Sequence, residues 1–437
     1  MKIVTKSNDI SLKSIFEDLV TPVLESVALK DNRRSNAKHS ALDALKTGFA
    51  IFHLKAPSLF AFRPRLETEE RNLKSIFKIG QIPSDNGLRD ILDNLPADEL
   101  NGGFERVLPF LESRGKLSPY RYWNGHLICS IDGVQHQCSK KVKCDYCLVR
   151  KHRNGSESYA HSMLTAAVVC PDLREVFVVN NEPIIKQDGE TKNDCERNAA
   201  KRLFDRLSDV FTDQPVVYVL DALYACAPVV NQIMDQGVGA KYVINAKEKG
   251  NKHLFAQFDA MNEAGQIKWT KKRVKDCLYH FGYANDLAIN KANEGVKYNL
   301  LYCRYKPKNG KEVVFSWVTN IELNALSIMP VMRMGRSRWK IENEVFNTLK
   351  NQEYNYGYNF GHGKNNLATN FAYLMMLAFT VDQIRQLCSR TFQRVYQVLD
   401  TRVKIWEMYR SIFRLVICED LVGFEHKLLE TCGLRVP

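Results

Sequence analysis

The chain has 437 residues, which is too long for one small hydrophobic core and predicts roughly two to four structural units. Its 45% hydrophobic and 10% aromatic residues are typical of a globular protein and exclude a disordered or low-complexity chain. The 62 Lys and Arg residues outnumber the 49 Asp and Glu residues, and the net charge of +13 makes a polyanion a suitable partner. Many basic proteins bind no nucleic acid, so charge alone does not decide the function.

The chain offers no clear membrane or secretion signal. Its longest strongly apolar run, Phe371–Val381, is too short to span a bilayer and is expected to be a core helix. The first residues lack the apolar stretch and small-residue cleavage site of a signal peptide. We therefore expect a cytoplasmic protein without membrane contact, whose 12 cysteines are reduced or metal-bound rather than paired in disulfides.

The N-terminal region, residues 1–123, is predicted to be mainly helical. Apolar residues recur at helical spacing over Ile10–Leu29, Ala41–Leu54 and Glu67–Ile79. Residues 83–85, Pro-Ser-Asp, have the composition of a capped helix start. This region is either a DNA-binding domain of the helix-turn-helix type or a packing domain.

From His126 the apolar pattern changes to that of strands, and later helices alternate with strands. No Gly-x-Gly-x-x-Gly or Walker loop is present, which argues against a dinucleotide or ATP site. The order of elements predicts an α/β core, an RNase H-like mixed sheet flanked by helices. The predicted elements are strands at Leu127–Ile131, Ser162–Cys170, Val176–Asn180, Val216–Leu220 and Lys241–Ala246, and helices at Asp194–Val210 and 228–236.

A long insertion divides this core. Residues 124–247 are predicted to be its first part and residues 325–390 its second part, with a β-rich insertion subdomain at 248–324 between them. The remaining residues, 391–437, are predicted to be a C-terminal helical region.

The insertion is rich in Lys with interleaved aromatic residues, a composition that suits DNA contact. Lys271, Lys272 and Arg273 are predicted to bind DNA phosphates. Trp269 and Trp317 are candidates for stacking on an unpaired base, although most tryptophans are core residues.

Three acidic residues mark the candidate active site. Asp132 and Asp221 each end a short apolar run, where a carboxylate is costly to bury without a partner. Glu342 follows Arg338 by one helical turn in Arg-Trp-Lys-Ile-Glu, so the two share a face. If the three carboxylates converge, they form an oxygen-rich site for two Mg²⁺ or Mn²⁺ ions about 4 Å apart. We predict that all three are catalytic metal ligands in a phosphoryl transfer.

Other interpretations of these acids stay open. Strand-terminal Asp residues also cap turns, and Glu342 could be a solvated helix residue paired with Arg338. Glu344 is the rival third acid, but it lies about 200° around the helix from Glu342. Ile341 and Val345 mark the buried face, which Glu342 borders and Glu344 does not, so Glu342 is preferred.

With these segments the chain resembles the DDE transposases of bacterial insertion sequences, in the group named for insertion sequence four. That group carries a Tyr-x2-Arg-x3-Glu-x6-Lys signature around the last acid and a β insertion before it. The resemblance covers about residues 124–365 and implies an RNase H-like catalytic core. The matching residues are Arg338, Trp339, Ile341 and Glu342, together with Asp132-Gly133 and the strand ending in Asp221.

The resemblance implies a DNA transposase that binds the ends of its element, cleaves DNA by two-metal-ion phosphoryl transfer and joins 3′ ends to target DNA. Its partner would be double-stranded DNA, and its active form a homodimer on two DNA ends. The alternatives are a domesticated transposase that binds DNA without cleaving it and an RNase H-like nuclease.

The chain departs from the signature at two positions that concern DNA contact rather than the metal ligands. Gly335 stands where the signature has Tyr, and Lys350 comes one place late, with Leu349 in the expected position. On a regular helix Leu349 lies about 20° from Glu342 and Lys350 about 80°. Arg338 and Lys350 are the residues of this helix that we predict to contact DNA. Lys350 can still reach DNA from the flank, or a one-residue helical bulge can correct its phase.

A second cluster has the spacing of zinc ligands. Cys144-x2-Cys147, with Cys138 and His152 as the nearest partners, can close a tetrahedral site. The alternative is a pair of reduced thiols in a basic hairpin, whose Lys and Arg residues face phosphates. Farther along, His362 lies in a Gly- and Asn-rich segment that either contacts DNA or only turns the chain.

Overall fold

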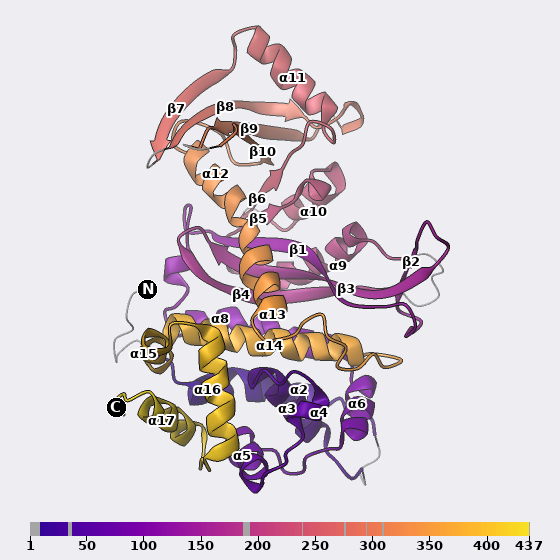
Figure 1. The fold of residues 1–437 in the computed structure, drawn as a ribbon. Helices are drawn as coiled ribbons and strands as arrows, with labels where there is room; N and C mark the ends of the chain where they lie inside the picture. The colour runs from indigo at the N-terminus through magenta and orange to yellow at the C-terminus, as the bar shows by residue number, and fades with distance from the viewer. Residues whose placement is uncertain are drawn as a thin grey trace.

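The computed structural model describes residues 9–33, 37–186, 193–237, 239–274, 277–293, 295–307 and 310–436. Ten strands in this part of the chain form one mixed sheet, and helices pack against it (Figure 1). Lys275, which the Lys-rich insertion includes, lies outside the described residues.

Five strands form the core of the sheet in the order β4-β3-β1-β5-β6. The first three in the chain, β1 (Leu127–Ser139), β3 (Glu157–Cys170) and β4 (Leu173–Ile184), pair antiparallel as a meander. Strand β5 (Val216–Leu220) then pairs parallel with β1, and β6 (Ala240–Asn245) parallel with β5. An antiparallel meander extended by parallel strands is the predicted RNase H-like arrangement, so the predicted fold class is confirmed. The short β2 (Leu148–Lys151) pairs with the beginning of β3.

The residues predicted as an insertion continue this sheet. Strands β7 (Lys268–Val274), β8 (Cys277–Ala288), β9 (Lys297–Tyr305) and β10 (Val313–Thr319) form a second antiparallel meander. Its last strand pairs with β6, with Trp317 opposite Asn245. That pairing covers the edge of the core sheet, which would otherwise offer free backbone groups. The helix α11 (Lys252–Glu263) packs against β8.

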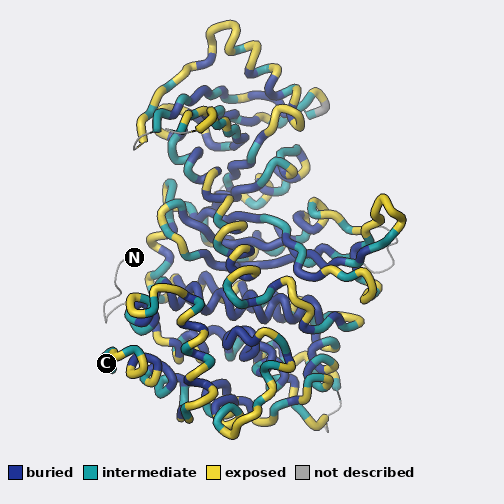
Figure 2. The backbone as a smooth tube through the Cα atoms, in the orientation of Figure 1, coloured by how far each residue is buried: buried dark blue, intermediate teal, exposed yellow. Residues whose placement is uncertain are grey.

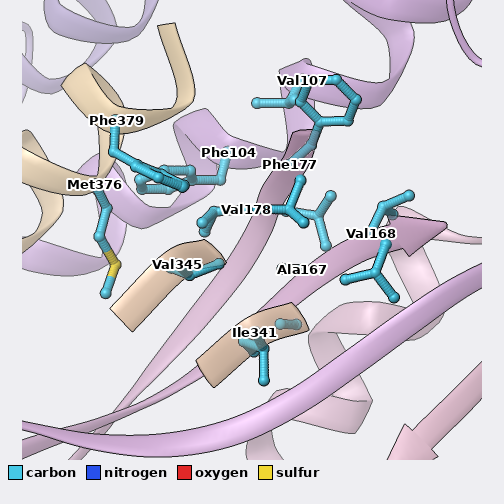
Figure 3. Close-up of a cluster of buried hydrophobic side chains, with 14 of the residues drawn as sticks. Phe104, Val107, Ala167, Val168, Phe177, Val178, Ile341, Val345, Met376 and Phe379 are labelled. Atoms are coloured by element: carbon cyan, nitrogen blue, oxygen red, sulfur yellow. The ribbon is translucent and has the colours of Figure 1, made fainter. Parts of the chain in front are cut away.

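A long helical run leads from the insertion back to the core. It consists of α12 (Ile328–Ser337), the π-helical segment η7 (Ile341–Phe346) and α13 (Asn347–Asn351). Figure 3 shows Ile341 and Val345 of η7 beside Ala167 and Val178 of the sheet and Met376 beyond them. This apolar contact sets the rotation of η7 about its axis and leaves Glu342 on the solvent side.

The longest helix, α14 (Leu367–Cys388), runs between the sheet and the helices of the N-terminal and C-terminal regions (Figure 1). By length and composition it could cross a membrane, yet its apolar window is wholly buried in the protein, as expected for a core helix. Figure 2 shows buried residues concentrated in α14 and the central strands.

The N-terminal and C-terminal helices share one layer around α14. Asn72, from the N-terminal region, donates hydrogen bonds to the carbonyls of Phe413 and Val416. The backbone N–H of Leu12 likewise donates to Glu425. The layer contains α1 (Leu12–Ile15), η2 (Phe16–Val20), α2 (Thr21–Ala28), α3 (Ala41–His53), α4 (Leu59–Phe62), α5 (Glu67–Phe77), α6 (Asp85–Asn94), α7 (Ala97–Gly102), η3 (Gly103–Arg106), α8 (Val107–Glu112), α15 (Arg390–Leu399), α16 (Arg402–Leu415) and α17 (Leu421–Thr431).

A buried ion pair ties α14 to this layer. The Lys55 ammonium lies 2.6 Å from the Asp382 carboxylate, and both side chains are fully buried. Tyr354 donates a second hydrogen bond to the same carboxylate oxygen at 2.5 Å. Lys55 also lies over the rings of Tyr354 and Trp406, so its charge is surrounded by one carboxylate and two aromatic faces.

Candidate active site

Asp132 lies within β1, which continues past it to Ser139, and Asp221 directly follows β5, the parallel neighbour of β1. The register of β1 with β5 sets Leu127 opposite Val216 and Ser130 opposite Val219. Continued by two residues, the same register brings Asp132 level with Asp221. Residues at the same level of paired strands point to the same face, so both carboxylates lie on one side of the sheet.

Each of the two carboxylates is also held by a backbone N–H. Asp221 begins the short 3-10 turn η5 (Ala222–Tyr224) and accepts a hydrogen bond from the N–H of Leu223 at 2.8 Å. Asp132 accepts from the N–H of Gly133 at 2.9 Å. One oxygen of each aspartate therefore caps a turn, as the alternative interpretation of these residues proposes. The second oxygen of each carboxylate can bind another partner.

Arg338 supplies the second partner of Asp132. Its guanidinium donates to Asp132 Oδ2 at 2.9 Å, and the Ser130 hydroxyl donates to its backbone carbonyl. The Arg338 side chain is only 9% exposed, and its guanidinium is engaged with Asp132, so little of it is left for the predicted contact with DNA. Its charge instead balances the acidic site from the helix that carries Glu342.

A third carboxylate near the aspartates, Glu196, was not predicted from the sequence. It is the first residue of α9 (Glu196–Val210) and accepts a hydrogen bond from the Tyr224 hydroxyl at 2.7 Å. A Cβ on Gly133 would lie 2.9 Å from a Glu196 oxygen, so the glycine lets the Glu196 carboxylate approach β1 beside Asp132 without a shift. The Asp132-Gly133 pair is the one signal in the sequence for this close approach.

Two of these carboxylates, Asp132 and Glu196, have a pKa above the ordinary value. Burial raises the pKa of Asp132, Arg338 lowers it and the charge of Asp221 raises it further. Burial also raises the pKa of Glu196, with added repulsion from Asp221 and Asp132. A site with three mutually repelling carboxylates and one arginine has an excess of negative charge and only oxygen donors. Such a donor set fits Mg²⁺ or Mn²⁺.

Glu342 follows Arg338 on the same helical run and is exposed, whereas Glu344 forms an ion pair with Arg174 at 3.1 Å. Asp132, Asp221 and Glu342 are not among the groups of three or more ligand atoms that the described residues bring close enough together to hold a metal ion.

The π-helical segment changes the relation between Glu342 and Lys350. The N–H of Asn347 donates to the carbonyl of Glu342, a bond over five residues rather than four. A π-helical turn holds one residue more than a regular turn. Lys350 therefore points in the direction that the residue seven positions after Glu342 would have on a regular helix, about 20° from Glu342. Lys350 and Glu342 are both exposed, while Leu349 is fully buried. The one-residue helical bulge, which the sequence leaves as one of two possibilities, is therefore present.

Gly335, which stands where the family signature has Tyr, lies against Trp317. A Cβ at this position would lie 2.3 Å from the indole nitrogen, so no side chain fits there. Trp317 itself is buried in the core of the sheet and cannot stack on a DNA base.

The basic residues of β7 lie on the outermost strand of the sheet. Lys271 and Arg273 are exposed and alternate along the strand with Trp269, which puts all three on one face. Trp269 keeps 41% of its surface exposed. Lys272 points to the other face and donates to the carbonyl of Ala325.

Two of the residues predicted as zinc ligands meet partners other than those predicted. Cys144 and Cys147 lie beside His161 and His362, and the ligand atoms of all four are within 4.8 Å of one another. Cys138 is exposed and outside this group, and His152 instead makes a hydrogen bond with the Ser158 hydroxyl. His362 is buried in this cluster, so its side chain is not exposed for the predicted contact with DNA.

No protein-family model matches the chain, and no curated protein matches it in sequence. Among solved structures the chain is similar to a piggyBac transposase in a synaptic complex with hairpin DNA. The similarity has a TM-score of 0.44 and a sequence identity of 12%, and it covers 98% of this chain and 84% of that chain. At this level the comparison assigns neither an activity nor site residues to this chain.

Proposed function

We propose that the protein is a metal-dependent DNA transposase, which cleaves DNA at the ends of its element and joins the 3′ ends to a target. The observation that carries the proposal is the β1–β5 register, which brings Asp132 level with Asp221 in an RNase H-like sheet. Glu342 follows by one turn the Arg338 whose guanidinium reaches Asp132, and this shared helical run supports Glu342 as the third acid. Joining two DNA ends to one target needs two such sites, so the proposal includes a pair of chains.

Two divalent ions, when bound, would activate a water or 3′-hydroxyl and stabilise the leaving oxygen of a phosphodiester. Asp132 and Asp221 would hold them, with Glu342 as the third ligand. Arg338 and the N–H of Gly133 each donate to a different oxygen of Asp132 and so fix the orientation of its carboxylate. Glu196 adds negative charge next to both aspartates and strengthens the attraction for cations.

The experiment that tests the proposal is cleavage of a plasmid carrying the DNA that flanks the gene on both sides. With Mg²⁺ the protein is expected to cut this plasmid, and chelation should stop the reaction. Asp221→Asn should slow cutting by about 10³-fold or more, because several kcal/mol of transition-state stabilisation are lost with a metal ligand. The matched control is Asp213→Asn, at an exposed carboxylate just before β5.

Cleavage that survives chelation, or an unchanged rate in Asp221→Asn, would overturn the proposal. Specific binding of the flanking DNA with no cutting under any divalent metal would favour the domesticated, non-cleaving alternative. Cutting of RNA in DNA hybrids in preference to the flanking DNA would favour the nuclease alternative.

We also propose that β7 contacts DNA through its exposed basic face. Replacing Lys271 and Arg273 with Gln is expected to weaken binding to all DNA sequences and to lower the slope of log affinity against log salt by about 2, since each phosphate contact contributes about 0.9. Fluorescence anisotropy with duplex DNA at several salt concentrations measures this slope. Lys404→Gln with Lys427→Gln removes the same charge from the helical layer and should leave the slope unchanged.

A further inference from the structure

Four metal-ligating side chains that the proposed cleavage does not use meet at the side of the core sheet. They are Cys144 and Cys147 from the loop after β1, His161 from β3, and His362 from the loop before α14. We propose that they bind one structural Zn²⁺ ion, and that this ion fastens a basic arm of the protein to the catalytic core.

Four of the six distances between ligand atoms in the cluster are close to the edges of a tetrahedral zinc site. Bonds of about 2.3 Å to sulfur and about 2.0 to 2.1 Å to nitrogen give tetrahedral edges of about 3.8 Å between two sulfurs and about 3.6 Å between sulfur and nitrogen. The two Sγ atoms lie 3.7 Å apart. The Nε2 atom of His161 lies 3.2 Å from Cys144 Sγ and 3.4 Å from Cys147 Sγ, and that of His362 lies 3.5 Å from Cys147 Sγ.

The donor set points to zinc in a structural role. Two thiolates with two imidazoles suit Zn²⁺ better than the oxygen-seeking ions of the acidic site. Four protein ligands close a tetrahedral coordination sphere and leave no position for a reacting water. Cys147, His161 and His362 are buried, so solvent reaches the cluster only from the side of Cys144.

The two histidines are held in place by contacts of their own segments. His161 pairs with Gln137 across β1 and β3, directly after a bulge at His136 that shifts the register of the two strands. The loop of His362 is fixed to α6, because Asp93 accepts hydrogen bonds from three of its backbone N–H groups, those of Lys364, Asn365 and Leu367. The core thus presents two preorganised imidazoles, and the loop after β1 brings the two thiols to them.

The ion would therefore join an exposed part of the chain to a part that leads into the buried core. On one side is the arm of residues 139–157, whose basic side chains Lys140, Lys141, Lys143, Arg150, Lys151 and Arg153 are all exposed. On the other side is the loop that leads into the buried helix α14. Without the ion, the arm keeps the β2–β3 hairpin pairing but loses its cross-link to that loop. We therefore expect zinc to order the arm.

Elemental analysis of protein purified without chelator tests the site and is expected to give about one zinc ion per chain. Cys147→Ser and His362→Asn should each lose this zinc. Cys138→Ser and His152→Asn are the matched controls and should retain it, because these residues lie outside the cluster. If the two control variants lost zinc and His362→Asn retained it, the proposed set of four ligands would be wrong.

Cobalt substitution of the wild-type protein makes the result independent of how the variants fold. After removal of zinc, added Co²⁺ should give the visible absorption of a tetrahedral ion with thiolate ligands, and added Zn²⁺ should abolish it. Tryptic cleavage within residues 139–157 should be faster in the zinc-free protein and return to the original rate when Zn²⁺ is restored. Protein that contains no zinc as purified and gives no such cobalt spectrum would overturn the proposal, whatever its cleavage activity on DNA.

Discussion

Glu342→Gln is expected to abolish Mg²⁺-dependent DNA cleavage, with a loss of about 10³-fold or more, and to leave DNA binding largely intact. The amide has the size of the carboxylate but lacks the charge that a divalent ion requires. Glu342 is exposed on the helical run one turn after Arg338, whose guanidinium reaches Asp132. Comparing the cleavage rate with the affinity for DNA of the same sequence measures the two effects separately.

Two nearby glutamates serve as comparisons for Glu342. Glu344→Gln should cleave at nearly the wild-type rate, because Glu344 is engaged with Arg174 and points away from the aspartates. Glu196→Gln is expected to raise the Mg²⁺ concentration needed for half-maximal cleavage, since its charge adds to the field around both aspartates. If Glu196→Gln abolished cleavage and Glu342→Gln did not, the third ligand would be Glu196.

Asp382→Ala is expected to lower the free energy of unfolding by about 3–5 kcal/mol, because it leaves the ammonium of Lys55 buried without its carboxylate. The pair is fully buried, and burial already lowers the pKa of Lys55, opposed by the attraction of Asp382. Tyr354 loses its hydrogen-bond acceptor in the same variant. Denaturant unfolding followed by circular dichroism measures the difference.

The exposed pair of Lys13 and Glu17 gives the matched control for this prediction. Glu17→Ala also removes an acidic partner of a lysine, but both side chains are at least half exposed and the cost should stay below about 1 kcal/mol. The double variant Lys55→Met with Asp382→Leu should recover much of the stability lost in Asp382→Ala, because no unpaired charge remains. A cost for Asp382→Ala as small as that for Glu17→Ala would contradict the argument.

The local pattern of the sequence predicts the two strands that bring the aspartates to one place in the sheet. Short apolar runs followed by an acid identify β1 and β5, but the prediction that the first strand ends at Asp132 is wrong, because β1 continues through Asp132 to Ser139. Both strands can be identified because the apolar run and the acid that follows it are close together in the sequence. The fold class could be predicted for the same reason.

Glu196, His161 and His362 could not be found in this way, because their partners come from distant parts of the chain. Glu196 is the first residue of a helix, a position where acidic residues are common without any catalytic role. His161 and His362 are 201 positions apart in the sequence, counted from their numbers, and no spacing rule connects them. The spacing rule for zinc ligands favours residues that are close in the sequence and so predicts Cys138 and His152. In the structure both residues lie outside the cluster.

The sequence also predicts β structure in residues 248–324 without showing how it joins the core. Alternating patterns identify strands but not their partners, because any free edge offers the same backbone donors and acceptors. The pairing of β10 with β6 depends on both strands being adjacent after the meander has formed. Trp317 illustrates the limit, since its burial depends on Gly335 of a later helix.

The π-helical turn at Ile341–Phe346 has a consequence for how relatives of such proteins can be searched for by sequence. A motif counts residues, whereas a helix presents side chains by angle, and one added residue in a wide turn changes the count without changing the angle. A pattern that demands six residues between the acid and the lysine rejects this chain, in which seven separate Glu342 from Lys350. A pattern with a variable gap at this turn would accept it, and would also collect other chains in which the helix has absorbed an insertion.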